Sequence, residues 1–144
     1  MSPKLVSQLL GYSGLLPFFG FSLATHFFGG EVGAWASLGF IVYSLSIYAF
    51  LAGALWGQAQ GSDSTATAGT LITSNALVLF GVAATLLGQA ETTAVLMILG
   101  YVLLLVYESR VTQQDNWYRS MRRRLTAGVV ITHLLFIGLQ APSV

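Results

Sequence analysis

The residues that could take part in chemistry are few in this chain of 144 residues: two histidines, five acids, six bases and no cysteine. The lack of cysteine excludes disulfides, thiolate nucleophiles and iron–sulfur or zinc–thiolate sites. His26 and His133 are predicted to differ in depth by roughly 10–15 Å, so they cannot ligate one haem iron together. The sequence contains no P-loop, nucleophile elbow or metalloprotease motif. We therefore predict no catalytic residue, no metal site and no cofactor.

Four polar side chains are predicted to share one level inside the protein. At the rise of an α-helix, Asn75 and His133 lie about 12 Å from one end of their helices, and Tyr48 and Tyr101 fall close to that level. Polar groups on apolar helices turn inward, so we expect some of these residues to meet, with His133 neutral and bonded to a neighbouring helix. We interpret this layer as a polar clamp between helices or, alternatively, as a binding pocket for a quinone, lipid or ion.

A basic segment precedes the last apolar stretch, and five of the six cations lie between Arg110 and Arg124. Aromatic and arginine side chains suit the headgroup level, so the segment is predicted to form a short interfacial helix that contacts anionic lipid. The alternative is a topology anchor without a specific ligand. Nucleic-acid binding is not expected, because no recognised module accompanies the cluster. The residues are Trp117, Tyr118, Arg119, Arg122, Arg123 and Arg124.

Small residues recur every four positions in the second apolar stretch, at Ala49, Gly53, Gly57 and Gly61. Such a stripe lets helix backbones approach closely. We interpret it as helix packing within the chain, with a subunit interface as the alternative. Pro17 is predicted to kink the first helix.

The elements that must position these residues are membrane-spanning helices. The chain is 55% hydrophobic and 8% charged, against roughly 25% charged residues in a soluble domain. Its apolar stretches are apolar on every face, which excludes the alternation of a transmembrane β-barrel. We predict one all-α transmembrane domain over residues 1–144, a bundle of five helices. The spans are roughly 8–28, 34–57, 68–88, 92–108 and 124–140.

The cations predict the orientation. With five crossings and a cytoplasmic N-terminus, the inner segments are 1–7, 58–67 and 109–123, and all six cations fall on that side. Glu31 and Glu91 fall on the outer side, and the C-terminus after Gln140 is periplasmic. We predict a multi-pass protein of the bacterial inner membrane.

Three segments, SGLLPFFG, FLAGALWG and NWYRSMRRRLT, resemble those of small bacterial membrane proteins of domain-of-unknown-function family 3429, to which the mitochondrial transmembrane protein 69 is related. The resemblance covers most of the chain. It implies a five-helix membrane protein and brings no established activity. The matching positions are Gly14, Leu16, Pro17, Phe18, Tyr43, Phe50, Leu51, Gly53, Trp56, Gly57, Trp117, Tyr118, Arg119, Arg122, Leu125 and Thr126.

Two positions depart from the pattern of that family. Leu55 stands where the family often has a histidine, so a function that depends on that histidine is not implied here. Glu108 stands where an aspartate is expected after the fourth helix, and we expect it to snorkel or to pair with Arg110.

We predict a non-enzymatic accessory or scaffold protein that packs against a second copy or a larger membrane complex. Its close-packing stripe and basic anchor favour this role. The alternatives are a small transporter or channel that uses the polar layer, and a quinone- or lipid-binding membrane protein. The expected partners are membrane lipids, anionic on the cytoplasmic side, with no nucleic acid.

Overall fold

The computed structural model describes residues 1–61 and 65–140, and this part of the chain is helical and contains no strand. The all-α class predicted from the sequence is confirmed. Residues 62–64, in a predicted inner connection, and the predicted periplasmic end after Gln140 lie outside the described residues. The helices are α1 (Pro3–Ser13), α2 (Leu16–Phe27), α3 (Gly30–Gln60), α4 (Thr65–Leu87), α5 (Ala90–Val111) and α6 (Asn116–Gln140).

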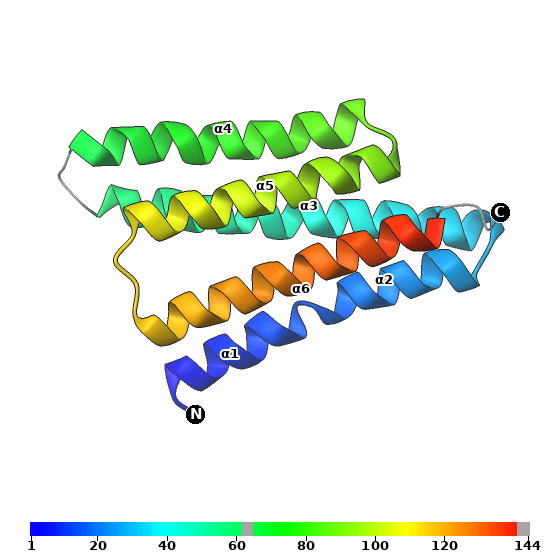
Figure 1. Cartoon of the computed structure of the whole chain (residues 1–144), viewed down its shortest axis with the longest axis horizontal. Coiled ribbons are helices and arrows are strands. Elements are labelled where there is room, and N and C mark those ends of the chain that lie inside the picture. The colour runs from blue at the N-terminus through cyan, green and yellow to red at the C-terminus, as the bar shows by residue number, and fades with distance from the viewer. Residues whose placement is uncertain (62–64, 141–144) are drawn as a thin grey trace.

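The helices lie side by side along one common direction (Figure 1). Helix α3 is central, because it packs on α2, α4 and α5. Helix α6 packs on α5 and α2, whereas α4 packs on α3 and α5 and forms one edge of the bundle. Helix α1 touches α6 only lightly. Helices α2, α3, α5 and α6 therefore form the body of the bundle, and α4 covers α3 and α5 at one edge.

Bulky apolar side chains cover the outside of this bundle. Trp35, Phe50, Ile72, Leu79 and Leu87 are between 68% and 88% exposed. Such a surface is suited to hydrocarbon rather than to water. Within residues 1–61 and 65–140, four segments are long and apolar enough to cross a membrane, and the protein is therefore a helical membrane protein. They are Pro3–Phe27, Gly30–Gln60, Thr67–Leu87 and Ala90–Val111.

Helix α6 is not among these four segments, because its arginines and His133 lower its mean hydropathy. The separate interfacial helix predicted before residue 124 is not present, and that prediction is wrong. One helix continues from Asn116 to Gln140, with Arg119 N–H donating to the Asp115 carbonyl oxygen at its start (3.0 Å). Neither glycine nor proline interrupts its first turns, so nothing in them favours a break.

The kink predicted at Pro17 is present as a break that divides the first span into α1 and α2. Proline lacks an N–H group, and its ring clashes with the carbonyl four residues earlier, here that of Ser13, where α1 ends. Gly14 lies at the break, and its carbonyl oxygen accepts a hydrogen bond of 2.9 Å from the Tyr43 hydroxyl of α3. This bond satisfies a backbone group at the break from inside the bundle, as a lipid environment requires.

Aromatic rings fill much of the core. Phe40 of α3 stacks on Phe136 of α6 with ring centroids 4.1 Å apart, and Phe18 of α2 meets Phe40 edge-on. Tyr48 of α3 lies edge-on against Tyr101 of α5, with centroids 5.3 Å apart. These contacts link α3 to α2, α5 and α6.

Two glycines make room for the ring of Tyr48. A Cβ atom at Gly81 of α4 would lie 2.8 Å from Tyr48 Cδ1, and one at Gly100 of α5 would lie 3.1 Å from Tyr48 Cζ. The same face of α3 carries Ala52 and Ala59, which are 0% and 6% exposed. Close packing inside the chain therefore uses this face of α3.

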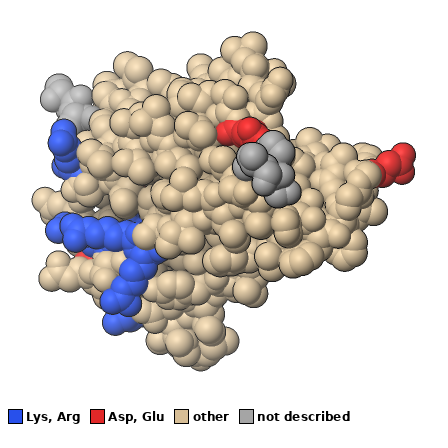
Figure 2. Space-filling model, turned by 45° about the vertical axis from the view of Figure 1, so that its right-hand side comes forward, with Lys and Arg blue, Asp and Glu red and all other residues tan. Residues whose placement is uncertain are grey.

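The charges separate along the bundle. Figure 2 shows the lysine and arginine atoms gathered at one end, and most of the visible acidic atoms lie towards the other. The basic end holds the start of α1, the end of α5 and the start of α6, and the opposite end holds Glu31 and Glu91 in the first turns of α3 and α5. This distribution is the one that the positive-inside rule produces.

Candidate functional site

His133 lies at the centre of a hydrogen-bonded cluster and is fully buried. Its Nδ1 lies 2.8 Å from the carbonyl oxygen of Val129, and its Nε2 lies 2.7 Å from Ser44 Oγ of α3. A carbonyl only accepts, so in the neutral ring Nδ1 donates to Val129 and Nε2 accepts from the Ser44 hydroxyl. Tyr101 of α5 donates a hydrogen bond of 2.7 Å to the Ser44 carbonyl oxygen. We call Ser44, Tyr101 and His133 the polar clamp, because they join α3, α5 and α6.

The polar clamp is enclosed by aromatic rings. The ring centroids of Phe40 and Phe18 lie 4.8 Å and 5.5 Å from that of His133. Ser44 and His133 have the spacing of a nucleophile and its base. However, a backbone carbonyl orients the imidazole where a catalytic triad has a carboxylate, and both side chains are 0% exposed. The hydrogen bonds of Ser44 connect α3 to α5 and α6.

Tyr48 lies beside the polar clamp, at the same depth in the bundle. Its ring meets Tyr101, and the residue is fully buried. Its hydroxyl has no hydrogen-bond partner among the described residues. Three of the four predicted layer residues, Tyr48, Tyr101 and His133, are thus brought together.

Asn75, the fourth predicted layer residue, is not part of this cluster. It is exposed on the outer face of α4, and its Nδ2 donates to the carbonyl oxygen of Leu71 in its own helix (2.9 Å). A bond within the helix satisfies one amide donor without a partner helix, so inward rotation is not required. Ser44 takes the place that we expected for Asn75. Ser44 lies one turn before Tyr48 on the same face of α3, and this spacing could have identified Ser44 as a member of the layer.

A buried ion pair lies at the basic end of the bundle. Arg122 of α6 donates through Nε (3.0 Å) and Nη2 (2.6 Å) to Glu108 Oε2 at the end of α5. Gln114 Nε2 donates to Glu108 Oε1 (2.8 Å). This pair corrects two expectations: Arg122 is buried rather than directed to lipid, and Glu108 pairs with Arg122 rather than with Arg110. A buried carboxylate needs a charged partner, and Arg122 is within reach across the α5–α6 connection.

The rest of the basic segment lies near the surface. Arg123 and Arg124 are exposed, and Tyr118 and Arg119 are partly buried. Trp117 donates to Asp115 Oδ2 (3.2 Å), and Lys4 Nζ lies 5.2 Å from the centre of the Trp117 ring. The start of α1 is thereby attached to the start of α6.

The small-residue stripe of α3 does not pack inside the chain. Gly53 and Gly57 are exposed, and a Cβ atom added at either would have nothing within 4 Å. Ala49 is partly buried. Our interpretation of this stripe as a packing face within the chain is wrong, because the neighbouring face with Ala52 and Ala59 performs that role. Among the described residues, no three His, Cys, Asp or Glu side chains come together to hold a metal ion.

Removing only one partner of the ion pair should lower the free energy of unfolding more than replacing both partners with apolar residues. Arg122→Met leaves Glu108 buried without its partner, so we expect a loss of about 3–5 kcal/mol in the free energy of unfolding, whereas Glu108→Leu with Arg122→Met should be close to neutral. Unfolding in mixed detergent micelles measures both. Arg124→Met, at an exposed position in the same helix, is the control and should change stability by less than about 0.5 kcal/mol. Additive losses in the double variant would contradict the pairing.

The polar clamp should contribute modestly to stability. We expect His133→Leu to cost about 0.6 kcal/mol and at most roughly 2 kcal/mol, because polar contacts between membrane helices are worth little on average. The same assay on Asn75→Leu is the control, since that amide bonds only within its own helix. An equal loss of unfolding free energy in the two variants would show that the hydrogen bond between helices does not contribute to stability.

Comparison with known proteins places the chain in a family without a described activity. Residues 3–138 match the family described as "Protein of unknown function (DUF3429)". No curated protein and no solved structure matches the chain. The matched range runs from the start of α1 nearly to the end of α6, so it covers the whole bundle. The family expected from the sequence is confirmed: the chain belongs to the DUF3429 family of proteins of unknown function.

Proposed function

We propose that this protein is a non-enzymatic accessory or scaffold protein of a bacterial inner membrane, and that it docks another transmembrane helix on the small-residue stripe of α3. The observation that supports the proposal is the open space over Gly53 and Gly57. In lipid, helices associate where small residues let backbones approach, and not where bulky side chains face the lipid. The stripe meets this requirement without having a role in the fold of the chain itself.

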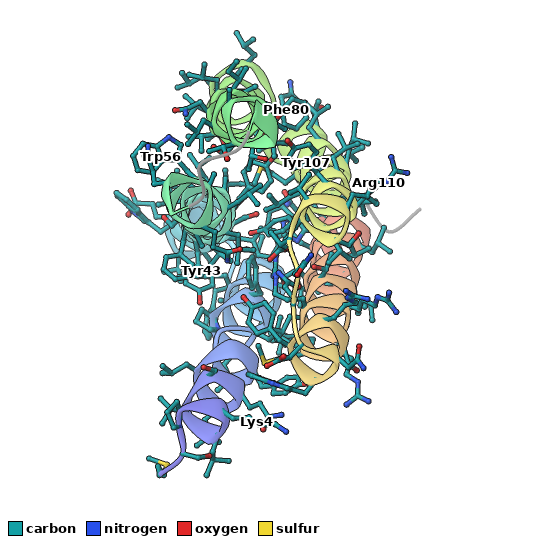
Figure 3. All side chains as sticks on the ribbon, turned by 90° about the vertical axis from the view of Figure 1, so that its left-hand side faces the viewer. Lys4, Tyr43, Trp56, Phe80, Tyr107 and Arg110 are labelled. Carbon is teal, nitrogen blue, oxygen red and sulfur yellow. The ribbon has the colours of Figure 1, made fainter. Side chains whose placement is uncertain are left out.

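The surroundings of the stripe also fit a contact surface. Phe50 is 71% exposed and Trp56 is 43% exposed, so large side chains flank the small ones. Trp56 points away from the bundle (Figure 3). A partner helix seated over the glycines would pack against these aromatic side chains on either side.

The alternative of a transporter or channel has less support. Such a protein needs a polar path that water or an ion can enter. The side chains of Ser44, Tyr101 and His133 are at most 1% exposed, and rings of Phe18 and Phe40 pack against the imidazole. In this conformation the side chains of the layer are packed against one another and are closed to water and ions.

Cross-linking can test docking on α3 because the chain contains no cysteine. Gly57→Cys, carrying a maleimide benzophenone, should form a discrete protein adduct in native membranes, at twice 15.4 kDa for self-association or at another fixed mass for a partner subunit. Leu79→Cys, on the exposed face of α4, is the control and should react only with lipid. Adding Gly53→Leu should abolish the adduct without loss of thermal stability, since that position is open. Identical adducts from both cysteine positions would contradict the proposal.

We further propose that α6 is a fifth crossing, with the N-terminus cytoplasmic. The 25-residue length of α6, its packing along α5 and the basic end of the bundle support this topology. Reporter fusions after Gly61 and after Val144 should then give opposite signals, cytoplasmic and periplasmic. Like signals at the two positions would rule out five crossings.

A further inference from the structure

A cavity of about 320 Å³ lies between α1, the break before α2, α3 and the first half of α6. This volume is at the lower end of the range for ligand sites, roughly 300–1,000 Å³. Its walls are mainly apolar. The apolar side chains include those of Leu10, Ile47, Leu51, Leu125 and Val129.

The cavity exists because α1 is not packed tightly against the bundle. None of the residues of α1 is buried, and its contacts with α6 are few. Gly11 and Gly14 line the cavity and contribute no side chain to fill it. The Pro17 break lets α1 depart from the line of α2, so the space remains between α1 and its neighbours.

Polar groups lie at the basic end of this cavity. Ser7, Tyr118 and Arg122 form part of its lining. Burial raises the pKa of the Tyr118 hydroxyl, which therefore stays protonated as a hydrogen-bond donor. Lys4 is one turn before Ser7, and its ammonium group lies over the ring of Trp117, the residue that precedes Tyr118.

The charge at this end is not balanced. Glu108 neutralises Arg122, but Arg119, next to Tyr118, has a buried Nε without a hydrogen-bond partner among the described residues. Among the described residues, the basic end has six cations against Glu108 and Asp115, a net charge of 6 − 2 = +4. A ligand with an apolar chain and an anionic head complements both parts of the cavity.

We propose that the cavity holds one acyl chain of an anionic phospholipid, with the lipid phosphate at the rim, beside Tyr118 of the cavity lining and the neighbouring cations Lys4 and Arg119. The apolar walls take the chain, and the rim supplies positive charge and a hydroxyl donor to the phosphate. The headgroup then lies at the basic end of the bundle, the end that we assign to the cytoplasmic leaflet. This inference does not rest on docking on α3, although Phe50, which flanks the docking stripe, also lines the cavity.

The first test is retention of lipid by the purified chain. After reconstitution in vesicles of equal phosphatidylglycerol and phosphatidylcholine and extraction in mild detergent, native mass spectrometry should show one phosphatidylglycerol per chain in excess of phosphatidylcholine. Ser7→Trp should block the cavity and remove most of this adduct. The control is Ser46→Trp, the same replacement at an exposed position of α3 outside the cavity lining. Equal adducts of the two lipids, or equal loss from both variants, would overturn the proposal.

The second test concerns the headgroup and does not depend on filling the cavity. Lys4→Gln should lower the preference for phosphatidylglycerol about fivefold, the effect of one cation near an anionic headgroup. Arg110→Gln removes the same charge from the same end, but Arg110 points away from the bundle (Figure 3) and should leave the preference unchanged. Thermal midpoints measured for all four variants show whether each remains folded. Retention of added ubiquinone in place of phosphatidylglycerol would assign the cavity to a neutral ligand and refute an anionic one.

Discussion

In hydrocarbon every backbone N–H and C=O group must find a partner within the protein, and this constraint shapes the whole bundle. It accounts for the helices, and also for the hydrogen bond from Tyr43 to the carbonyl of Gly14 where α1 and α2 separate. It extends to side chains that face outward. Ser46 and Asn75 bond to carbonyl oxygens of their own helices, at Val42 and Leu71. Polar side chains that face inward, such as those of the polar clamp, can instead form hydrogen bonds between helices.

This difference explains how much of the polar layer could be predicted. Depth along a helix follows from residue number, so the common level of Tyr48, Tyr101 and His133 could be derived from the sequence. Rotation about the helix axis could not, because α4 is apolar on nearly every face and shows no inward side. Asn75 therefore has the expected depth and the opposite direction. The same ambiguity affected α3, where Gly53 and Ala52 differ by one position but face lipid and core respectively.

The basic segment shows a second limit of the sequence. Charge composition predicted which end of the bundle is basic, but four arginines within six positions look alike in a linear sequence. Only the way in which α6 packs on α5 distinguishes Arg122, which pairs with Glu108, from its exposed neighbours Arg123 and Arg124. One position that departs from the family pattern also has a structural explanation. Leu55 is 2% exposed and belongs to the apolar core, so the core accommodates an aliphatic side chain there.

The fit of Tyr48 between two glycines has a consequence for sequence divergence. The Tyr48 ring occupies volume that side chains at positions 81 and 100 would otherwise fill. The side chains at these three positions therefore share one fixed space between α3, α4 and α5. A lineage that gains a side chain at Gly81 or Gly100 must shorten the residue at 48, or the helices must move apart. Neutral drift at any one of the three is therefore restricted by the other two. Over evolutionary time their sizes should change together, even though they are far apart along the chain.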